Sequence, residues 1–156
     1  MVDRAKELRI CLVSSAGGHT SQLLELADSW KGQHTCWVTT EGVIKGKLAK
    51  YGKVYVVGEC NRRQPLRVLL VLLRCIRIVL RERPDVVIST GAAAGCMVCF
   101  LSKMLGARIV WIDSITNVYR LSLSGRLVRY IADLFLVQWP ELAEKYRKVE
   151  YVGAVI

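Results

Sequence analysis

Short β-rich runs alternate with helical stretches along the whole sequence, and this alternation constrains the fold more than any other feature. Apolar runs predict strands near 8–14, 34–39, 53–58, 85–89, 108–112, 133–137 and 149–152. Helices are expected over 21–30, 43–50, 66–82, 93–105, 122–131 and 140–147, with Gly and Pro at the junctions. Such a series is typical of a parallel sheet covered by helices. We therefore expect a single Rossmann-like α/β domain over residues 1–156.

The composition of the 156 residues bounds the possible partners. A net charge of +10 indicates an anionic binding partner, which can be nucleic acid, an anionic membrane surface or phosphorylated substrates. We expect neither a signal peptide nor a membrane-spanning helix, because no segment reaches roughly 18 to 20 uninterrupted apolar residues. Most of the six cysteines lie in apolar runs, and no second Cys or His pair accompanies Cys96 and Cys99. We therefore predict buried thiols and no metal site.

The turn after the first predicted strand reads Ser14-Ser15-Ala16-Gly17-Gly18-His19-Thr20. Ligands bind at such junctions in parallel α/β folds, because strand ends converge there with the unpaired amides of a helix N-terminus. The glycines let a ligand approach the main chain, and Thr20 or Ser21 is expected to cap the helix. The candidate substrate-binding residues are Ser15, Gly17, Gly18 and Thr20, and His19 is a candidate general base. The alternative is a tight turn in which the histidine has no role.

A second turn of the same design follows the predicted strand at 85–89. It carries Ser89, Thr90 and Gly91 and leads into a helix of small residues, which permits close approach of the backbone. If both strands are central in the sheet, the two turns face the same crevice. All three residues are therefore candidates for substrate binding. The alternative is a helix start that is capped by Thr90.

Asp113 directly follows the predicted strand at 108–112, so its carboxylate is expected at the same edge of the sheet. A carboxylate and a histidine that face one crevice can supply a general base for a hydroxyl nucleophile. Asp113 is equally suited to the N-cap of a short turn, and nothing in the sequence fixes its distance from His19.

The predicted helix at 66–82 is apolar over much of its circumference. Four arginines interrupt it at spacings of seven, three and four, which places them on one stripe: Arg67, Arg74, Arg77 and Arg81. Arg62 and Arg63 precede the helix. The apolar arc is wider than contact with one sheet requires, so we expect this region to meet an anionic membrane or a partner protein. The alternative is a crossover helix whose arginines face water.

Taken together, these motifs resemble the Alg14 family. The resemblance rests on Gly17-Gly18-His19-Thr20, Ser89-Thr90-Gly91-Ala92, Leu121-Ser122-Leu123-Ser124-Gly125-Arg126-Leu127, Ala132-Asp133, Val137-Gln138-Trp139 and Tyr151-Val152-Gly153. It covers nearly the whole chain and keeps the order of the motifs. The family comprises membrane-associated subunits of split glycosyltransferases, including the subunit of the UDP-GlcNAc transferase of dolichol-linked glycan assembly and bacterial capsule or exopolysaccharide counterparts.

The resemblance implies half of an enzyme. The chain is similar to the N-terminal domain of a GT-B glycosyltransferase such as MurG, and a separate donor-binding subunit, Alg13-like, is expected to hold most of the UDP-sugar. The chain itself is expected to lie on the cytosolic face of a membrane and to bind a lipid diphosphate sugar as acceptor. The donor UDP-sugar is a substrate, and neither a cofactor nor a metal ion is expected.

The sequence departs from the family's pattern in two places. Eukaryotic members carry an N-terminal membrane anchor, which is not expected here, so the 62–83 region is the candidate for membrane attachment. Relatives tend to place Glu-Ser and then Arg-Val after the fifth strand, where this chain has Asp113-Ser114 and Asn117-Val118. We assign Asn117 and Arg120 to substrate binding, with Arg120 as the substitute for the missing positive charge.

The expected reaction is an inverting transfer in which an acceptor hydroxyl attacks the anomeric carbon of a UDP-sugar. His19 or Asp113 accepts the proton, the amides of Gly17 and Gly18 hold a diphosphate, and the chain is expected to be inactive without its partner. One alternative is a non-catalytic anchor and activator of the partner subunit. A nucleic-acid-binding protein rests on the net charge alone and is disfavoured, because the densest group of arginines lies on an apolar helix.

Overall fold

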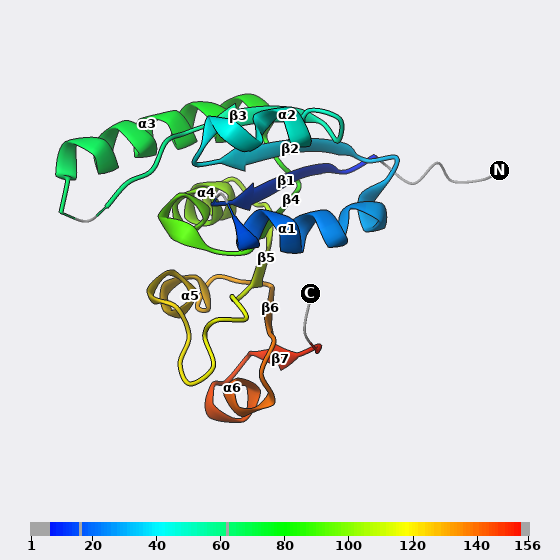
Figure 1. The fold of residues 1–156 in the computed structure, drawn as a ribbon, viewed down its shortest axis with the longest axis vertical. Coiled ribbons are helices and arrows are strands. Elements are labelled where there is room, and N and C mark those ends of the chain that lie inside the picture. Colours follow the sequence, from blue (N-terminus) through cyan, green and yellow to red (C-terminus); the bar gives the residue numbers. More distant parts are fainter. Residues whose placement is uncertain (1–6, 16, 62, 154–156) are drawn as a thin grey trace.

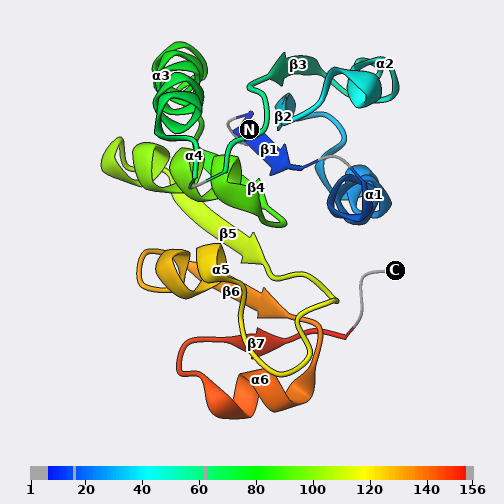
Figure 2. The same cartoon turned by 60° about the vertical axis from the view of Figure 1, so that its left-hand side comes forward.

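A seven-stranded parallel sheet forms the centre of the computed structural model, which describes residues 7–15, 17–61 and 63–153. The strands are β1 (Arg9–Ser14), β2 (His34–Thr39), β3 (Lys53–Val56), β4 (Val86–Ser89), β5 (Arg108–Ile112), β6 (Leu134–Val137) and β7 (Glu150–Tyr151). Their spatial order is β3-β2-β1-β4-β5-β6-β7, with every neighbouring pair parallel (Figures 1 and 2). The predicted α/β class and parallel sheet are therefore confirmed.

The helices agree with the predicted ones except at their ends. They are α1 (Gly18–Glu25), the 3-10 turn η1 (Ala27–Trp30), the 3-10 turn η2 (Gly42–Ile44), α2 (Lys45–Leu48), α3 (Pro65–Glu82), α4 (Ala92–Met104), α5 (Leu123–Val128) and α6 (Pro140–Lys145). The expected helix at 21–30 is wrong in its bounds, because α1 begins at Gly18 and gives way to η1. The N-cap of α1 is Gly17, with φ of 90°, so neither Thr20 nor Ser21 caps it. His19 consequently lies in the first turn of a helix.

The two faces of the sheet carry separate cores. In β1, Ile10 and Leu12 pack with Leu23 of α1 and Trp37 on one face. The intervening residues of β1 face α3 and α4 on the other, where the core includes Val71, Cys75, Val79, Val98 and Cys99. This alternation follows from the period of two in a strand, and it explains why β1 is apolar at almost every position.

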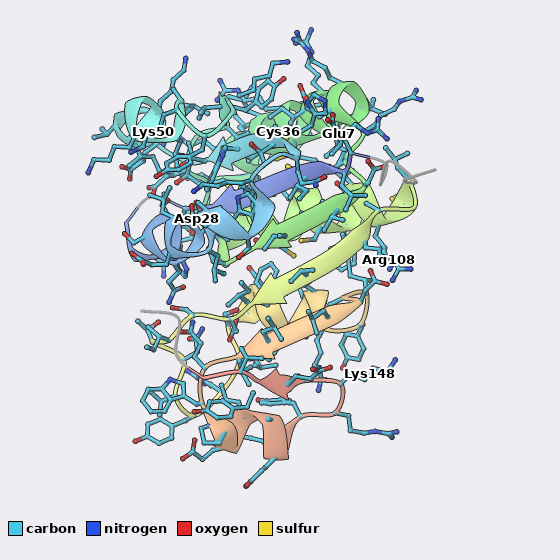
Figure 3. The ribbon with its side chains drawn as sticks, turned by 90° about the vertical axis from the view of Figure 1, so that its right-hand side faces the viewer. Glu7, Asp28, Cys36, Lys50, Arg108 and Lys148 are labelled. Carbon is cyan, nitrogen blue, oxygen red and sulfur yellow. The ribbon has the colours of Figure 1, made fainter. Side chains whose placement is uncertain are left out.

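The order of the strands places a topological switch point between β1 and β4. From β1 the chain moves outward through β2 and β3, and it then returns through α3 to β4 on the other side of β1. Ligands of open α/β sheets bind outside the carboxyl ends of the strands at such a point. The turns after β1 and β4 are therefore neighbours, as the sequence predicts. Figure 3 shows the opposite, amino edge, marked by Glu7, Arg108 and Lys148.

Candidate functional site

The imidazole of His19 lies against Gly91, so the turns after β1 and β4 meet at this pair. A Cβ atom on Gly91 would be 3.2 Å from Cε1 and 3.5 Å from Nδ1 of His19. Gly91 has φ of 140°, which favours glycine, and its lack of a side chain leaves room for the ring. The hydroxyl of Thr90 donates a 3.0 Å hydrogen bond to the carbonyl oxygen of His19 and ties the two turns together.

His19 is half-buried, and the charge of the Asp113 carboxylate acts on its ring. Burial lowers the pKa of His19, while the backbone of Thr90 and the charge of Asp113 act to raise it. The net shift is downward, so the ring is neutral at physiological pH. Its Nδ1 atom is buried and has no hydrogen-bond partner among the described residues. A neutral, half-buried histidine in the first turn of a helix is suited to accept a proton from a bound hydroxyl.

The other predicted residues of the turn after β1 differ in whether they are accessible to a ligand. Gly17 and Gly18 are exposed, and a Cβ on either would meet nothing within 4 Å. Thr20 is buried, and its hydroxyl donates to the carbonyl oxygen of Ser15 at 2.8 Å and shares a 2.9 Å hydrogen bond with the hydroxyl of Ser14. Thr20 therefore shapes the turn from inside, and only the glycines leave it open to a ligand.

Ser89 and Thr90 are also fully buried. The backbone N–H of Gly91 donates to the Ser89 hydroxyl at 3.3 Å, while Thr90 is engaged with His19. The alternative in which Thr90 caps the next helix is wrong, since the N-cap of α4 is Gly91. Both hydroxyls hold the turn in shape from within the protein.

Asp113 is 1% exposed, and both of its carboxylate oxygens accept two hydrogen bonds. Oδ1 accepts from the indole of Trp111 at 3.1 Å and the hydroxyl of Ser122 at 2.7 Å. Oδ2 accepts from the side chain of Asn117 at 3.2 Å and the backbone N–H of Ser122 at 3.1 Å. Because all of these donors belong to the chain itself, the carboxylate fixes the loop between β5 and α5 and acts on His19 only through its charge.

The loop between β5 and α5 is held in three places. Ser122 is the N-cap of α5, and its hydroxyl accepts from the N–H of Gly125 at 2.9 Å. Gln138 donates to the carbonyl oxygen of Asp113, and Trp139 donates to that of Ile115. Asn117 is committed to Asp113, whereas Arg120 is exposed, so of the two predicted binding residues in this loop Arg120 is the accessible one.

Gly125→Ala is expected to destabilise the protein by about 1–3 kcal/mol, because an added Cβ overpacks this site. The Cβ would lie 2.7 Å from Oδ1 of Asp113 and 2.8 Å from Oγ of Ser122, and both atoms are fixed by hydrogen bonds. The control is Gly46→Ala in α2, where a Cβ meets nothing within 4 Å and helix propensity favours alanine. Urea unfolding measures both variants. A Gly125→Ala variant as stable as the control would contradict the close packing of α5 on Asp113.

A cleft of about 490 Å³ lies beside this pair of turns, where the N-termini of α3 and α4 face the ends of β1 and β2. We call it the polar cleft; its lining residues are Ser15, Thr40, Glu59, Cys60, Asn61, Gln64, Arg67, Ala92, Ala93, Ala94 and Leu123. Among the predicted binding residues only Ser15 lines it. His19 and Gly91 are not among its lining residues, but Gly91 directly precedes Ala92, which is. Sequence reasoning missed Thr40 and Glu59–Asn61, although they too follow the ends of strands, which is the signal that could have found them.

The arginines that the sequence groups on one stripe differ in their contacts. Arg67 lines the polar cleft, and Arg74 donates a 2.8 Å hydrogen bond to the carbonyl oxygen of Val57. All five of these arginines that the structure describes, Arg63, Arg67, Arg74, Arg77 and Arg81, are exposed, while Arg62 lies outside the described residues. That they serve one membrane surface stays a prediction, and Arg67 in addition lines the cleft.

The outer face of α3 exposes leucines next to these arginines. Leu66 is 82% exposed, and Leu69, Leu70, Leu73 and Leu80 are each about half exposed. On α4, Phe100, Met104 and the following Leu105 are exposed as well. Within the described residues no helix is long and apolar enough to span a bilayer. Likewise, no group of three or more His, Cys, Asp and Glu side chains in the described part could hold a metal ion.

Comparison with known proteins identifies close relatives by sequence. The family model described as "Oligosaccharide biosynthesis protein Alg14 like" matches residues 10–155. The UDP-N-acetylglucosamine transferase subunit ALG14 of Mus musculus is 28% identical over 97% of this chain and 84% of its own length. That of Schizosaccharomyces pombe is 34% identical over 72% of this chain and 57% of its own length.

Solved structures share the fold at low sequence identity. Acinetobacter baumannii MurG aligns with a TM-score of 0.75 at 14% identity, covering 94% of this chain and 46% of the MurG chain. The UDP-GlcNAc 2-epimerase of Neisseria meningitidis, solved with UDP-GlcNAc, aligns with a TM-score of 0.64 at 11% identity, covering 95% of this chain and 47% of its own. The chain therefore spans less than half of each of these two proteins, and the likeness shows the fold alone.

Proposed function

The chain belongs to the Alg14 family, and on this premise we propose that it is the acceptor-side subunit of a two-chain glycosyltransferase. The transfer moves GlcNAc or another hexose from a UDP-sugar to a saccharide on a polyprenyl diphosphate carrier. The observation that carries the proposal is the neutral His19 seated on Gly91 at the switch point, beside a polar cleft. The relatives' name, a transferase subunit, supports a second chain that completes the enzyme.

His19 is the proposed general base. The acceptor hydroxyl oxygen attacks the anomeric carbon of the UDP-sugar as the bond from that carbon to the diphosphate breaks and UDP leaves. The hydroxyl proton passes to the imidazole, and attack opposite the leaving group inverts the anomeric centre. Asp113 is a positioning residue in this proposal, because its four hydrogen bonds leave the carboxylate to hold the loop and to stabilise the protonated ring by its charge. The step is proposed without a metal ion.

The polar cleft is suited to the diphosphate and the sugar of the acceptor. The first turn of α4 lines it through Ala92–Ala94 and directs unpaired amides and the positive end of the helix dipole toward a bound anion. Arg67 adds a full positive charge. Glu59, Asn61 and Gln64 offer groups that can hydrogen-bond sugar hydroxyls. This assigns the anion to α4 and Arg67, in addition to the Gly17–Gly18 turn.

The partner completes the site from the other side. In this proposal it is an Alg13-like subunit that binds most of the UDP-sugar, and the chain is inactive without it. The carboxyl edge of the sheet, where β1, β4 and β5 end, is the surface that faces the donor. The chain also recruits the partner to the cytosolic face of the membrane.

Attachment to the membrane is proposed for the outer face of α3 and the adjoining end of α4. The exposed leucines of α3 enter the interface between headgroups and acyl chains, and Arg63, Arg77 and Arg81 contact anionic headgroups. This arrangement is peripheral, as an amphipathic helix requires neither a spanning segment nor a lipid anchor when basic residues accompany its apolar face.

The double variant Arg77→Gln/Arg81→Gln is expected to bind anionic vesicles about 30-fold more weakly, since each basic residue near the surface contributes about 1 kcal/mol. Co-sedimentation with vesicles of phosphatidylglycerol and phosphatidylcholine measures the affinity at low and high salt. The control Lys45→Gln/Lys47→Gln on α2 makes the same change of net charge at other exposed positions. Equal losses in both variants would mean that overall charge, and not the face of α3, attracts the membrane.

The pH profile of transfer is expected to report His19. Because burial lowers its pKa, the imidazole stays neutral down to a pH below its ordinary value of 6.5. A protonated base cannot accept a proton, so kcat/KM falls as pH decreases through this pKa and is level above it. The midpoint of the acid limb is expected below 6.5. A midpoint above 6.5, with the complex intact at each pH, would contradict the assignment of His19.

The direct test is a transfer assay with membranes that contain this chain, with and without its partner, against a panel of UDP-sugars and lipid-linked acceptors. We expect transfer only when both chains are present. Transfer that persists in loop variants of this chain would instead favour a non-catalytic anchor and activator. The absence of transfer under every pairing would sink the proposal.

A further inference from the structure

An apolar groove adjoins the polar cleft between α3 and α4. Its volume is about 460 Å³, and it is lined by Cys60, Pro65, Val68, Leu69, Leu72, Ala93 and Met97. The only lining side chains with a heteroatom are Cys60 and Met97, whose sulfurs are weakly polar. Cys60 and Ala93 also line the polar cleft, so the two hollows share a wall. A ligand can therefore occupy both without leaving the surface of the protein.

The charges around the two hollows are distributed as an amphipathic ligand would require. Arg67 and the first turn of α4 lie on the side of the polar cleft, whereas the lining of the groove holds no ionisable group other than the thiol of Cys60. Arg67 and Val68 are consecutive residues of α3, and Ala92 and Ala93 are consecutive residues of α4. On α3 the lining thus changes from charged to apolar within one residue, and on α4 the two hollows share Ala93.

The groove leads toward the face of α3 and α4 that exposes apolar residues. Leu69 is 51% exposed, so it both lines the groove and belongs to the outer leucines of α3. Phe100 and Met104 follow Met97 on α4 at spacings of three and seven, which continues the same side of the helix. An apolar chain that enters at the cleft can run along the groove and leave it at the face that meets the membrane.

We propose that the polar cleft binds the diphosphate of an isoprenoid diphosphate lipid and that the apolar groove binds the first isoprene units of its tail. The proposal rests on the proposed function and deepens it by assigning the tail of the acceptor to residues of this chain. The tail occupies the groove because burial of apolar area stabilises the complex, and its shared wall with the cleft sets the distance between head and tail. The acceptor is thereby anchored with its sugar directed toward His19.

The test compares the binding of inorganic diphosphate, geranyl diphosphate and farnesyl diphosphate to the full chain by titration calorimetry. We expect farnesyl diphosphate to bind at least about tenfold more tightly than geranyl diphosphate, since it buries further methylene groups. Leu69→Gln is expected to remove most of this gain, and the matched control Leu73→Gln, at a side chain that is equally 51% exposed but outside the groove, is expected to retain it. Binding of inorganic diphosphate is expected to be unchanged in both.

A second pair of variants tests whether the polar cleft binds the diphosphate group of the ligand. Arg67→Gln is expected to weaken the binding of all three ligands about equally, whereas Arg147→Gln, at an exposed arginine outside both the cleft and the groove, is expected to leave it unchanged. Affinity that is independent of chain length, or equal losses in Leu69→Gln and Leu73→Gln, would overturn the proposal. Displacement of farnesyl diphosphate by dihexanoyl-phosphatidylglycerol, with the same sensitivity to Leu69→Gln, would assign the groove to bilayer phospholipid and also overturn it.

These outcomes are separable from failure of the proposed function. The transfer assay with the partner present reports the reaction itself and uses no variant of the groove. If transfer occurs but the affinity for the diphosphates does not depend on the length of the isoprenoid chain, only the proposal for the groove is overturned. Chain-length-dependent binding without transfer under any pairing would overturn the reaction and leave the groove as a site for isoprenoid diphosphate.

Discussion

His19→Ala is expected to lower the turnover of the reconstituted two-chain enzyme by about 10²–10⁴-fold, which is the usual contribution of a general base. The imidazole contacts Gly91, and its removal leaves the acceptor hydroxyl without a nearby neutral base. The measurement is steady-state transfer with saturating partner. Co-purification of the variant with the partner is expected to remain normal, because the imidazole lies against the chain's own Gly91.

The matched control is His34→Ala. His34 is the only other histidine, and it lies at the amino end of β2, exposed and paired with Glu7. Its loss is expected to leave turnover unchanged. Normal turnover of His19→Ala would remove the histidine from the mechanism, and equal losses in the two variants would show that the effect is not local to the switch point.

Asp113→Asn is expected to lower the free energy of unfolding by about 2–6 kcal/mol. Each carboxylate oxygen of Asp113 now accepts hydrogen bonds from two donors, and the amide nitrogen of asparagine would replace one of these oxygens and could accept from neither donor. Each buried donor left unpaired costs about 1–3 kcal/mol. This is a large part of the 5–15 kcal/mol that stabilises an ordinary domain. Urea unfolding followed by circular dichroism measures the change.

The control for this variant is Asp28→Asn, the same substitution on an exposed carboxylate that pairs with Lys31 on the surface. Exposed ion pairs contribute about 0–1 kcal/mol, so its stability is expected to be close to that of the parent chain. If Asp113→Asn were as stable as this control, the hydrogen bonds at Asp113 would not be what holds the loop between β5 and α5.

The order of helices and strands was predictable because a single periodicity of apolar residues dominates each segment of the sequence. All seven strands lie within two residues of their predicted bounds, since buried parallel strands are runs of apolar residues bounded by Gly, Pro or charge. The start of α1 was not predictable, because Gly17 with φ of 90° makes the turn tighter than its sequence suggests. That difference moves His19 from a loop into a helix.

The partners of the site residues could be predicted only in part. The meeting of His19 with Gly91 follows from two turns at adjacent central strands, which sequence order can indicate. The commitment of Asp113 to Ser122, nine residues along the chain, depends on how the loop folds back, and no periodicity encodes it. The same holds for Arg67: its place in the lining of the polar cleft depends on Glu59–Asn61 lying beside the start of α3, which no periodicity encodes.

The exposed apolar face of α3 and α4 was predictable as an excess of apolar residues but not in its extent. The spacing of leucines on α3 shows that one side remains uncovered, and this is confirmed by the exposure of Leu66 and Leu73. The contribution of Met104 on α4 depends on the packing of α4 beside α3, which only the tertiary structure shows. Whether this face binds a membrane stays a prediction.

The central claim is that this chain holds the acceptor and its partner holds the donor. Titration calorimetry of the isolated chain with UDP-GlcNAc and with GlcNAc linked to farnesyl diphosphate tests this division most directly. The isolated chain is expected to bind the lipid-linked sugar, whereas UDP-GlcNAc is expected to bind only once the partner is added. Tight binding of UDP-GlcNAc to the isolated chain, with no binding of the lipid-linked sugar, would contradict this division.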